Sequence, residues 1–213
     1  MRSKKEYQIH WATHHDVCPE TPEEAVIYEM ISEMANDGNS SKFRENITKW
    51  MVGLSESQSK HGYDDDTLAI EVKPQNYTRK ATKLGGGGNF NDLTWRRHRK
   101  YLQDELLILQ SGFHFGKLVY IVEFPYVSIA PILEARLQNI LPHGDVPKVY
   151  DRWGTFKCTD WSSQPHKVRY LSPEFHHYHH DITPCLQQVL QTSPVDSSTI
   201  QAKSFISTLD LLL

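Results

Sequence analysis

The stretch HGYDDDTLAIEVKP (His61–Pro74) places three aspartates directly before a short apolar strand that also carries a glutamate and a lysine. Because side chains alternate across a β-strand, the aliphatic Ile70 and Val72 share one face. Glu71 and Lys73 share the opposite face, close to the acidic turn. The stretch therefore predicts a strand with one face packed in a core, while the other face displays an acid beside a base. Such a pair is either a surface ion pair or part of a metal site.

The size and charge of the chain restrict its class. A length of 213 residues suits one domain that buries a sizeable core, and 38% hydrophobic with 23% charged residues is an ordinary globular composition. The net charge is −3, so the molecule as a whole is not a polycation. Nucleic-acid binding would therefore need a local basic patch.

The amino-terminal and cysteine patterns favour an intracellular chain. The opening MRSKKEYQIHWATHHD lacks the apolar core of a secretory signal, and no apolar run is long enough to span a membrane. The three cysteines, Cys18, Cys158 and Cys185, lie far apart in the sequence and form no CxxC pair, which favours a reducing compartment. We expect a cytoplasmic protein, or a nuclear one if the source is a eukaryote or a virus, with no membrane partner.

Two helices are expected before the acidic strand. The segment TPEE (21–24) combines an N-cap threonine, a proline at the first helical position and a glutamate at the capping-box position, and an apolar stripe follows it. A second amphipathic helix is predicted from four apolar residues at helical spacing, Phe43, Ile47, Trp50 and Leu54. The strand that follows is expected over 67–73, and Pro74 is expected to end it.

Further helices and strands alternate in the rest of the chain. The expected segments are a polar loop (75–94), a helix (95–110), a strand apolar on both faces (117–124), a helix whose start Pro131 delays (128–141), two short strands and a modest last helix. This order predicts an α/β fold, with a central mixed β-sheet flanked by helices. The chain divides into an irregular segment (1–20), a single α/β domain (21–192) and a carboxy-terminal tail (193–213).

Carboxylates that converge at a sheet edge indicate hydrolytic chemistry. Two or three of them can hold Mg²⁺, a hard cation that takes oxygen ligands. A lysine beside them cannot be a ligand, but it can orient or help deprotonate the attacking water. It can also stabilise the charge that develops on a phosphate in the transition state. An aspartate followed by Glu-x-Lys on a hairpin is thus a compact set of groups for hydrolysing phosphodiesters.

Asp64 followed by Glu71-Val72-Lys73 resembles the signature of the PD-(D/E)XK nuclease superfamily, and the resemblance covers residues 21–124. It implies a restriction-endonuclease-like α-β-β-β-α-β core, with the acidic hairpin at its centre and the later elements as carboxy-terminal additions. It also implies that Asp64 and Glu71 are ligands of Mg²⁺, for which Mn²⁺ can substitute. Lys73 completes the implied catalytic set of Asp64, Glu71 and Lys73.

Two features set the chain apart from the usual pattern of that superfamily. Tyr63 replaces the proline before the acid. If the next two aspartates formed a two-residue turn, Asp64 would face Thr67, and Glu71 would lie about 13 Å away at about 3.3 Å per residue. The site closes only if the turn is wider, so that Asp64 lies opposite or diagonal to Glu71.

The helix after the Gly-rich segment GGGG (85–88) begins with the densest basic patch of the chain. The predicted nucleic-acid contacts are Arg96, Arg97, Arg99, Lys100 and Gln103. The alternative is an ordinary solvated helix face. The resemblance further implies a glutamate from the first helix, and the candidates among which the sequence does not choose are Glu23, Glu24 and Glu33.

These features predict a metal-dependent nuclease that hydrolyses DNA phosphodiester bonds, in the first place an endonuclease. One alternative is a non-catalytic nucleic-acid-binding module on the same fold, which would retain DNA without cutting it. Another is an RNA-directed endonuclease. The sequence leaves open the recognition site, and whether two subunits pair as a homodimer to cut both strands.

Overall fold

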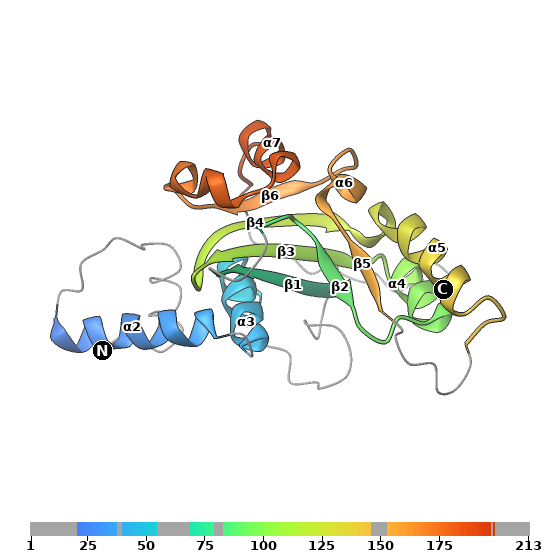
Figure 1. Ribbon diagram of the computed structural model, residues 1–213, viewed down its shortest axis with the longest axis horizontal. Helices are drawn as coiled ribbons and strands as arrows, with labels where there is room; N and C mark the ends of the chain where they lie inside the picture. Colours follow the sequence, from blue (N-terminus) through green and yellow to red (C-terminus); the bar gives the residue numbers. More distant parts are fainter. Residues whose placement is uncertain are drawn as a thin grey trace, which may run out of the picture.

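The computed structural model describes residues 21–37, 40–54, 69–78, 83–145, 153–196 and 198. Their elements in chain order (Figure 1) are α2 (Pro22–Asn36), α3 (Ser41–Met51), β1 (Ile70–Tyr77), β2 (Gly88–Phe90), α4 (Trp95–Gln103), β3 (Leu107–His114), β4 (Lys117–Pro125), the 3-10 helix η1 (Tyr126–Ser128), α5 (Ala130–Ile140), β5 (Gly154–Phe156), α6 (Cys158–Trp161), β6 (Lys167–Leu171), the 3-10 helix η2 (Phe175–Asp181) and α7 (Pro184–Thr192).

Four strands form a mixed sheet in the order β1-β3-β4-β6. β1 runs parallel to β3 through a crossover that contains α4, whereas the β3–β4 and β4–β6 pairs are antiparallel. β2 and β5 form a separate antiparallel ribbon. The predicted α/β fold, with a central mixed sheet flanked by helices, is confirmed. The finer α-β-β-β-α-β order depends on residues before β1, and residues 55–68 lie outside the described part of the chain.

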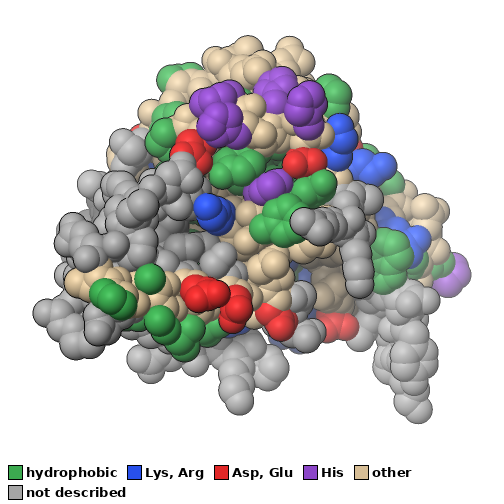
Figure 2. Space-filling model, turned by 60° about the vertical axis from the view of Figure 1, so that its left-hand side comes forward, with side chains coloured by type: hydrophobic (Ala, Val, Ile, Leu, Met, Phe, Trp, Pro, Cys, Tyr) green, Lys and Arg blue, Asp and Glu red, His purple; other side chains and the backbone are tan. Residues whose placement is uncertain are grey.

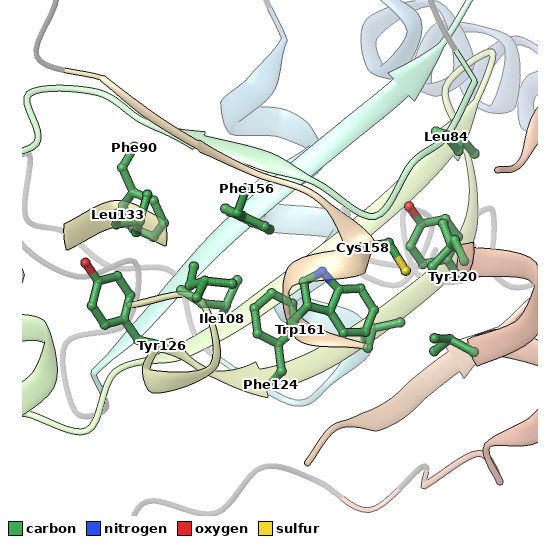
Figure 3. Packing of buried hydrophobic residues seen from close by; sticks show 14 of the residues in the cluster. Leu84, Phe90, Ile108, Tyr120, Phe124, Tyr126, Leu133, Phe156, Cys158 and Trp161 are labelled. Atoms are coloured by element: carbon green, nitrogen blue, oxygen red, sulfur yellow. The ribbon is translucent and has the colours of Figure 1, made fainter. Parts of the chain in front are cut away.

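Two hydrophobic clusters pack on opposite faces of this sheet. α2 and α3 cover one face, where the cluster includes Ile31, Ala35, Ile47, Ile70, Val72 and Phe113. On the other face the sheet packs against the β2–β5 ribbon, α5, α6 and α7. Figure 3 shows Trp161 of α6 against Phe124 of β4, and the two rings stack with centroids 4.6 Å apart. Each fully buried side chain of this size contributes about 1.5–3 kcal/mol of stability.

β1 alternates as its sequence predicts. Ile70 and Val72 are 0% and 2% exposed and belong to the cluster beneath α2 and α3. Glu71 and Lys73 are partly buried on the opposite face. The prediction of one core face and one acid–base face is therefore confirmed.

The prediction that the strand ends at Pro74 is wrong, because β1 continues to Tyr77. At its two ends, Leu107 N donates to Ala69 O and Phe115 N donates to Tyr77 O. The backbone N–H and C=O groups of successive residues in a strand point to opposite edges. Those of the odd-numbered residues of β1 therefore point toward β3. Pro74 therefore turns its nitrogen to the outer edge, where the missing N–H removes no hydrogen bond to β3.

The predicted helix over 95–110 is wrong beyond Gln103. Glu105 has a left-handed backbone with φ of 51°, and β3 begins at Leu107. The apolar run that follows lies between β1 and β4, so long-range pairing and burial outweigh the local helical pattern.

Other predicted segments differ less from the structure. The predicted loop over 75–94 contains the end of β1 and all of β2. The predicted strand over 117–124 is confirmed as β4, and α5 has Pro131 in its first turn. The two short strands and the last helix are β5, β6 and α7.

A buried arginine on α3 forms hydrogen bonds with the end of α2. Arg44 of α3 is 6% exposed, and its Nη1 donates to Ala35 O at 2.7 Å and to Asp37 O at 2.8 Å. These carbonyls belong to the end of α2, where backbone acceptors lack partners within the helix. Burial lowers the pKa of Arg44, although the nearby Asp37 and Glu45 oppose that shift.

We expect Arg44→Ala to lower the free energy of unfolding by about 2 kcal/mol, because it leaves the buried Ala35 carbonyl and the partly buried Asp37 carbonyl without their charged donor. Urea unfolding followed by circular dichroism measures the loss. Lys42→Ala is the matched control on the same helix, since the Lys42 side chain is 60% exposed. Equal stability of the two variants would contradict the role of Arg44.

Candidate functional site

The acid and base of β1 form a close, sheltered pair. Lys73 Nζ lies 2.5 Å from Glu71 Oε1, and the two side chains are 16% and 19% exposed. The Lys73 ammonium also lies 4.6 Å from the centre of the Phe90 ring on β2. Water screens such a pair less than it screens an exposed one. The pair is thus built into the wall formed by β1 and the β2–β5 ribbon.

A cleft of about 970 Å³ follows β1, with Lys73 in its lining. β1 contributes Val72, Lys73, Pro74, Gln75 and Tyr77. α3 contributes Ser41 and Glu45 from one face of the sheet. The other face contributes Gly85 and Gly87, the start of β2 at Gly88, and the end of β5. Because the walls come from both faces, the cleft passes around the outer edge of β1, the edge away from β3.

Glu45 is a cleft carboxylate that the sequence analysis missed. It lies on α3, where its Oε1 accepts a hydrogen bond from Ser41 Oγ at 3.1 Å and its Oε2 lies 3.4 Å from Lys42 Nζ. The predicted candidates were all on α2, and Glu33 is exposed there. The signal that could have found Glu45 is order in the chain, since α3 is the helix directly before the acidic strand and packs against β1.

The aspartate of the predicted site, Asp64, lies outside the described residues, as do Asp65 and Asp66. The structure therefore brings Glu71 and Lys73 together and leaves the position of Asp64 as a prediction. Within the described ranges, no group of three or more His, Cys, Asp or Glu side chains is arranged to hold a metal ion. The Glu71 carboxylate fits the oxygen chemistry of Mg²⁺, and the second predicted ligand, Asp64, belongs to the segment before β1.

The glycine run 85–88 lets the chain approach the β5–α6 segment closely. A Cβ at Gly87 would lie 2.4 Å from Phe156 O, and one at Gly88 would lie 3.0 Å from the Lys73 Cβ. Gly86 has φ of +65°, and its carbonyl accepts a hydrogen bond from Trp161 Nε1 at 2.8 Å. The run therefore serves close packing of a cleft wall.

The basic start of α4 is exposed, with His98 as its buried residue. Arg96, Arg97, Arg99, Lys100 and Gln103 are all exposed. Lys100 pairs with Asp104, and the Asp145 carboxylate accepts the Trp95 and Arg96 backbone N–H groups. Among the predicted nucleic-acid contacts, Arg97 is hydrogen-bonded to a residue of the cleft. Its Nη1 donates at 3.3 Å to the carbonyl of Asn91, which lines the cleft.

If Arg96 and Arg97 make the predicted nucleic-acid contacts, the double variant Arg96→Ala/Arg97→Ala should weaken DNA binding about tenfold and reduce the slope of log affinity against log salt by about 1–2. Both effects would follow from the loss of the predicted phosphate contacts. Fluorescence anisotropy with labelled duplex DNA at several salt concentrations measures them. An unchanged salt slope would show that this patch is an ordinary solvated helix face.

A second polar cluster lies at the far end of β1 and was not predicted. His114 Nε2 lies 2.9 Å from Asp181 Oδ2, and the Tyr77 and His114 rings stack with centroids 5.0 Å apart. Burial alone would raise the pKa of Asp181, but hydrogen bonds from Tyr77 and His114 hold it below its usual value. Asp181 and Lys83 line the cleft. No local pattern joins these residues, since His114 and Asp181 are 67 positions apart.

The histidines of η2 gather on the surface. Figure 2 shows them as a group over that segment, and they are His176, His177, His179 and His180. His176, His177 and His180 are exposed, and His179 Nε2 lies 2.8 Å from Gln191 Nε2.

A scan against protein-family models and a search of curated proteins found no match to this chain. In the described part of the chain, none of the helices has the length and apolar character needed to cross a membrane.

Proposed function

We propose that this chain is a metal-dependent nuclease that hydrolyses DNA phosphodiester bonds, an endonuclease of the PD-(D/E)XK type. The observation that carries the proposal is the Glu71–Lys73 pair, sheltered on one face of β1 with Lys73 lining a cleft along the outer edge of that strand. The β1–α4–β3 unit supports it, because the resemblance includes a basic helix and an apolar strand after Glu-x-Lys.

Each residue of the proposed site has a separate task. Asp64 and Glu71 would hold Mg²⁺, which when bound supplies Lewis-acid stabilisation of the phosphate charge. Lys73 places its ammonium group where it can orient the attacking water and stabilise the negative charge that develops on the phosphate. Its contacts with Glu71 and the Phe90 ring fix the position of that ammonium in advance.

The cleft carries charges of both signs. Lys73, Lys83 and Lys157 line it together with the carboxylates Glu45 and Asp181, and Arg97 lies at its margin through Asn91, so cations that can contact a phosphate stand beside carboxylates. The whole chain carries a net charge of −3, so these cations form a local attraction rather than part of a uniformly basic surface.

Incubation with supercoiled plasmid DNA tests the proposal. We expect nicking and linearisation with Mg²⁺ and with Mn²⁺, and none with EDTA. Circular single-stranded DNA and single-stranded RNA are digested in parallel. Retention of DNA without metal-dependent cutting would replace the proposal with a non-catalytic binding module, and cutting of RNA alone would replace it with an RNA-directed endonuclease.

A further inference from the structure

Cys158 and Cys185 are remote in sequence but adjacent in the structure. Their sulfur atoms lie 2.6 Å apart, within about half an ångström of the length of a disulfide bond. Cys158 opens α6 and is buried, whereas Cys185 lies in the first turn of α7 and is partly exposed. We propose that these two thiols are a redox-active pair, which an oxidant of the peroxide class converts into a disulfide between α6 and α7.

The surroundings of the two thiols give them different roles. Burial raises the pKa of Cys158, so at neutral pH this sulfur is held as the thiol. Cys185 is the more accessible of the two, and its sulfur lies 3.5 Å from Ser162 Oγ. Cys185 is therefore the sulfur that meets the oxidant, and Cys158 is the sulfur that closes the bond.

The reaction balances with peroxide as the only co-reactant. Peroxide transfers one oxygen atom to the Cys185 sulfur, which gives a sulfenic acid and one water. The Cys158 sulfur then attacks the Cys185 sulfur and forms the S–S bond. The displaced hydroxide takes the Cys158 proton and leaves as a second water. A dithiol reductant returns two electrons and two protons and restores both thiols.

The pair lies directly behind one wall of the cleft. A Cβ added at Gly86 would lie 3.3 Å from the Cys158 Cβ. Trp161, which belongs to α6 like Cys158, donates a hydrogen bond from its Nε1 to the Gly86 carbonyl. Lys157, which precedes Cys158, lines the cleft, and so does Thr183, two residues before Cys185. The disulfide would therefore join the two segments that carry this wall, while β1 stays unchanged.

In the test, the full chain is first reduced, then separated from the reductant, and then treated with hydrogen peroxide. We expect two of the three thiols to be lost, with a mass decrease of about 2 Da for the two hydrogens removed. Proteolysis should yield one crosslinked peptide pair that contains Cys158 and Cys185. Three remaining thiols, a crosslink through Cys18, or a Cys185 that proceeds to sulfinic acid would each overturn the proposal.

Serine variants provide matched controls. Cys158→Ser and Cys185→Ser each abolish the crosslink, whereas Cys18→Ser retains it. The disulfide would join residues 27 positions apart, so peroxide should raise the midpoint of thermal unfolding by about 5–10 °C in the native chain and in Cys18→Ser alone. No cleavage assay enters this test, and its outcome is independent of the proposed nuclease activity.

Discussion

Replacing Lys73 by alanine is expected to lower Mg²⁺-dependent DNA cleavage by about 10²–10³-fold, the usual loss when a preorganised charge at the transition state is removed. Lys73→Ala also removes the partner of Glu71, which lies 2.5 Å away. Glu71→Ala removes a proposed metal ligand, and we expect it to abolish cleavage. The initial rate of plasmid nicking at saturating Mg²⁺ measures both effects.

Lys167→Ala is the matched control for the Lys73 variant. Lys167 also lies on an edge strand and pairs with a carboxylate, Asp196, at 3.2 Å, but its strand is β6 at the opposite side of the sheet. We expect full cleavage activity in that variant. Circular dichroism and thermal unfolding show whether each variant remains folded. Plasmid nicking at the native rate by a folded Lys73→Ala and a folded Glu71→Ala protein would refute the nuclease proposal.

The largest expected effect on stability comes from Gly112→Ala in β3. A Cβ at this position would lie 2.0 Å and 2.5 Å from two atoms of the Tyr120 ring, which is fully buried on β4. The ring cannot move aside in a close-packed core, so we expect a loss of about 3 kcal/mol or more in the free energy of unfolding. Denaturant unfolding measures this loss.

Gly85→Ala is the comparison for the Gly112 variant, since its new Cβ would meet only ordinary van der Waals neighbours at 3.7 Å and 3.8 Å. We expect its stability to change by less than about 1 kcal/mol. In a Tyr120→Ala background, the further loss caused by Gly112→Ala should shrink, because the clashing ring is absent. Additive losses would show that the glycine is needed for a reason other than the Tyr120 ring.

The local patterns of the sequence predicted what depends on neighbouring residues. The alternation around Ile70 and Glu71 assigned the two faces of β1 correctly, because a strand exposes successive side chains to opposite sides. Capping signals and helical spacing located α2 and α3, because these patterns also depend only on residues close together in the chain. The amphipathic strand was therefore predictable without tertiary information.

The features that the sequence analysis did not predict depend on tertiary contacts. The run from Leu107 has an apolar pattern that fits a helix, and only its place between β1 and β4 makes it a strand. Glu45 enters the cleft because α3 packs beside β1, and Cys158 meets Cys185 because α6 and α7 are neighbours. None of these contacts follows from spacing along the chain.

The nitrogen of Pro74 has a consequence for self-association. A second copy that added a strand to the outer edge of β1 would find no donor at Pro74, in the middle of the strand. Proline at such an edge is a common protection against the growth of sheets from one molecule into the next. Pro74 therefore disfavours self-association in which a second copy adds a strand to this edge of β1.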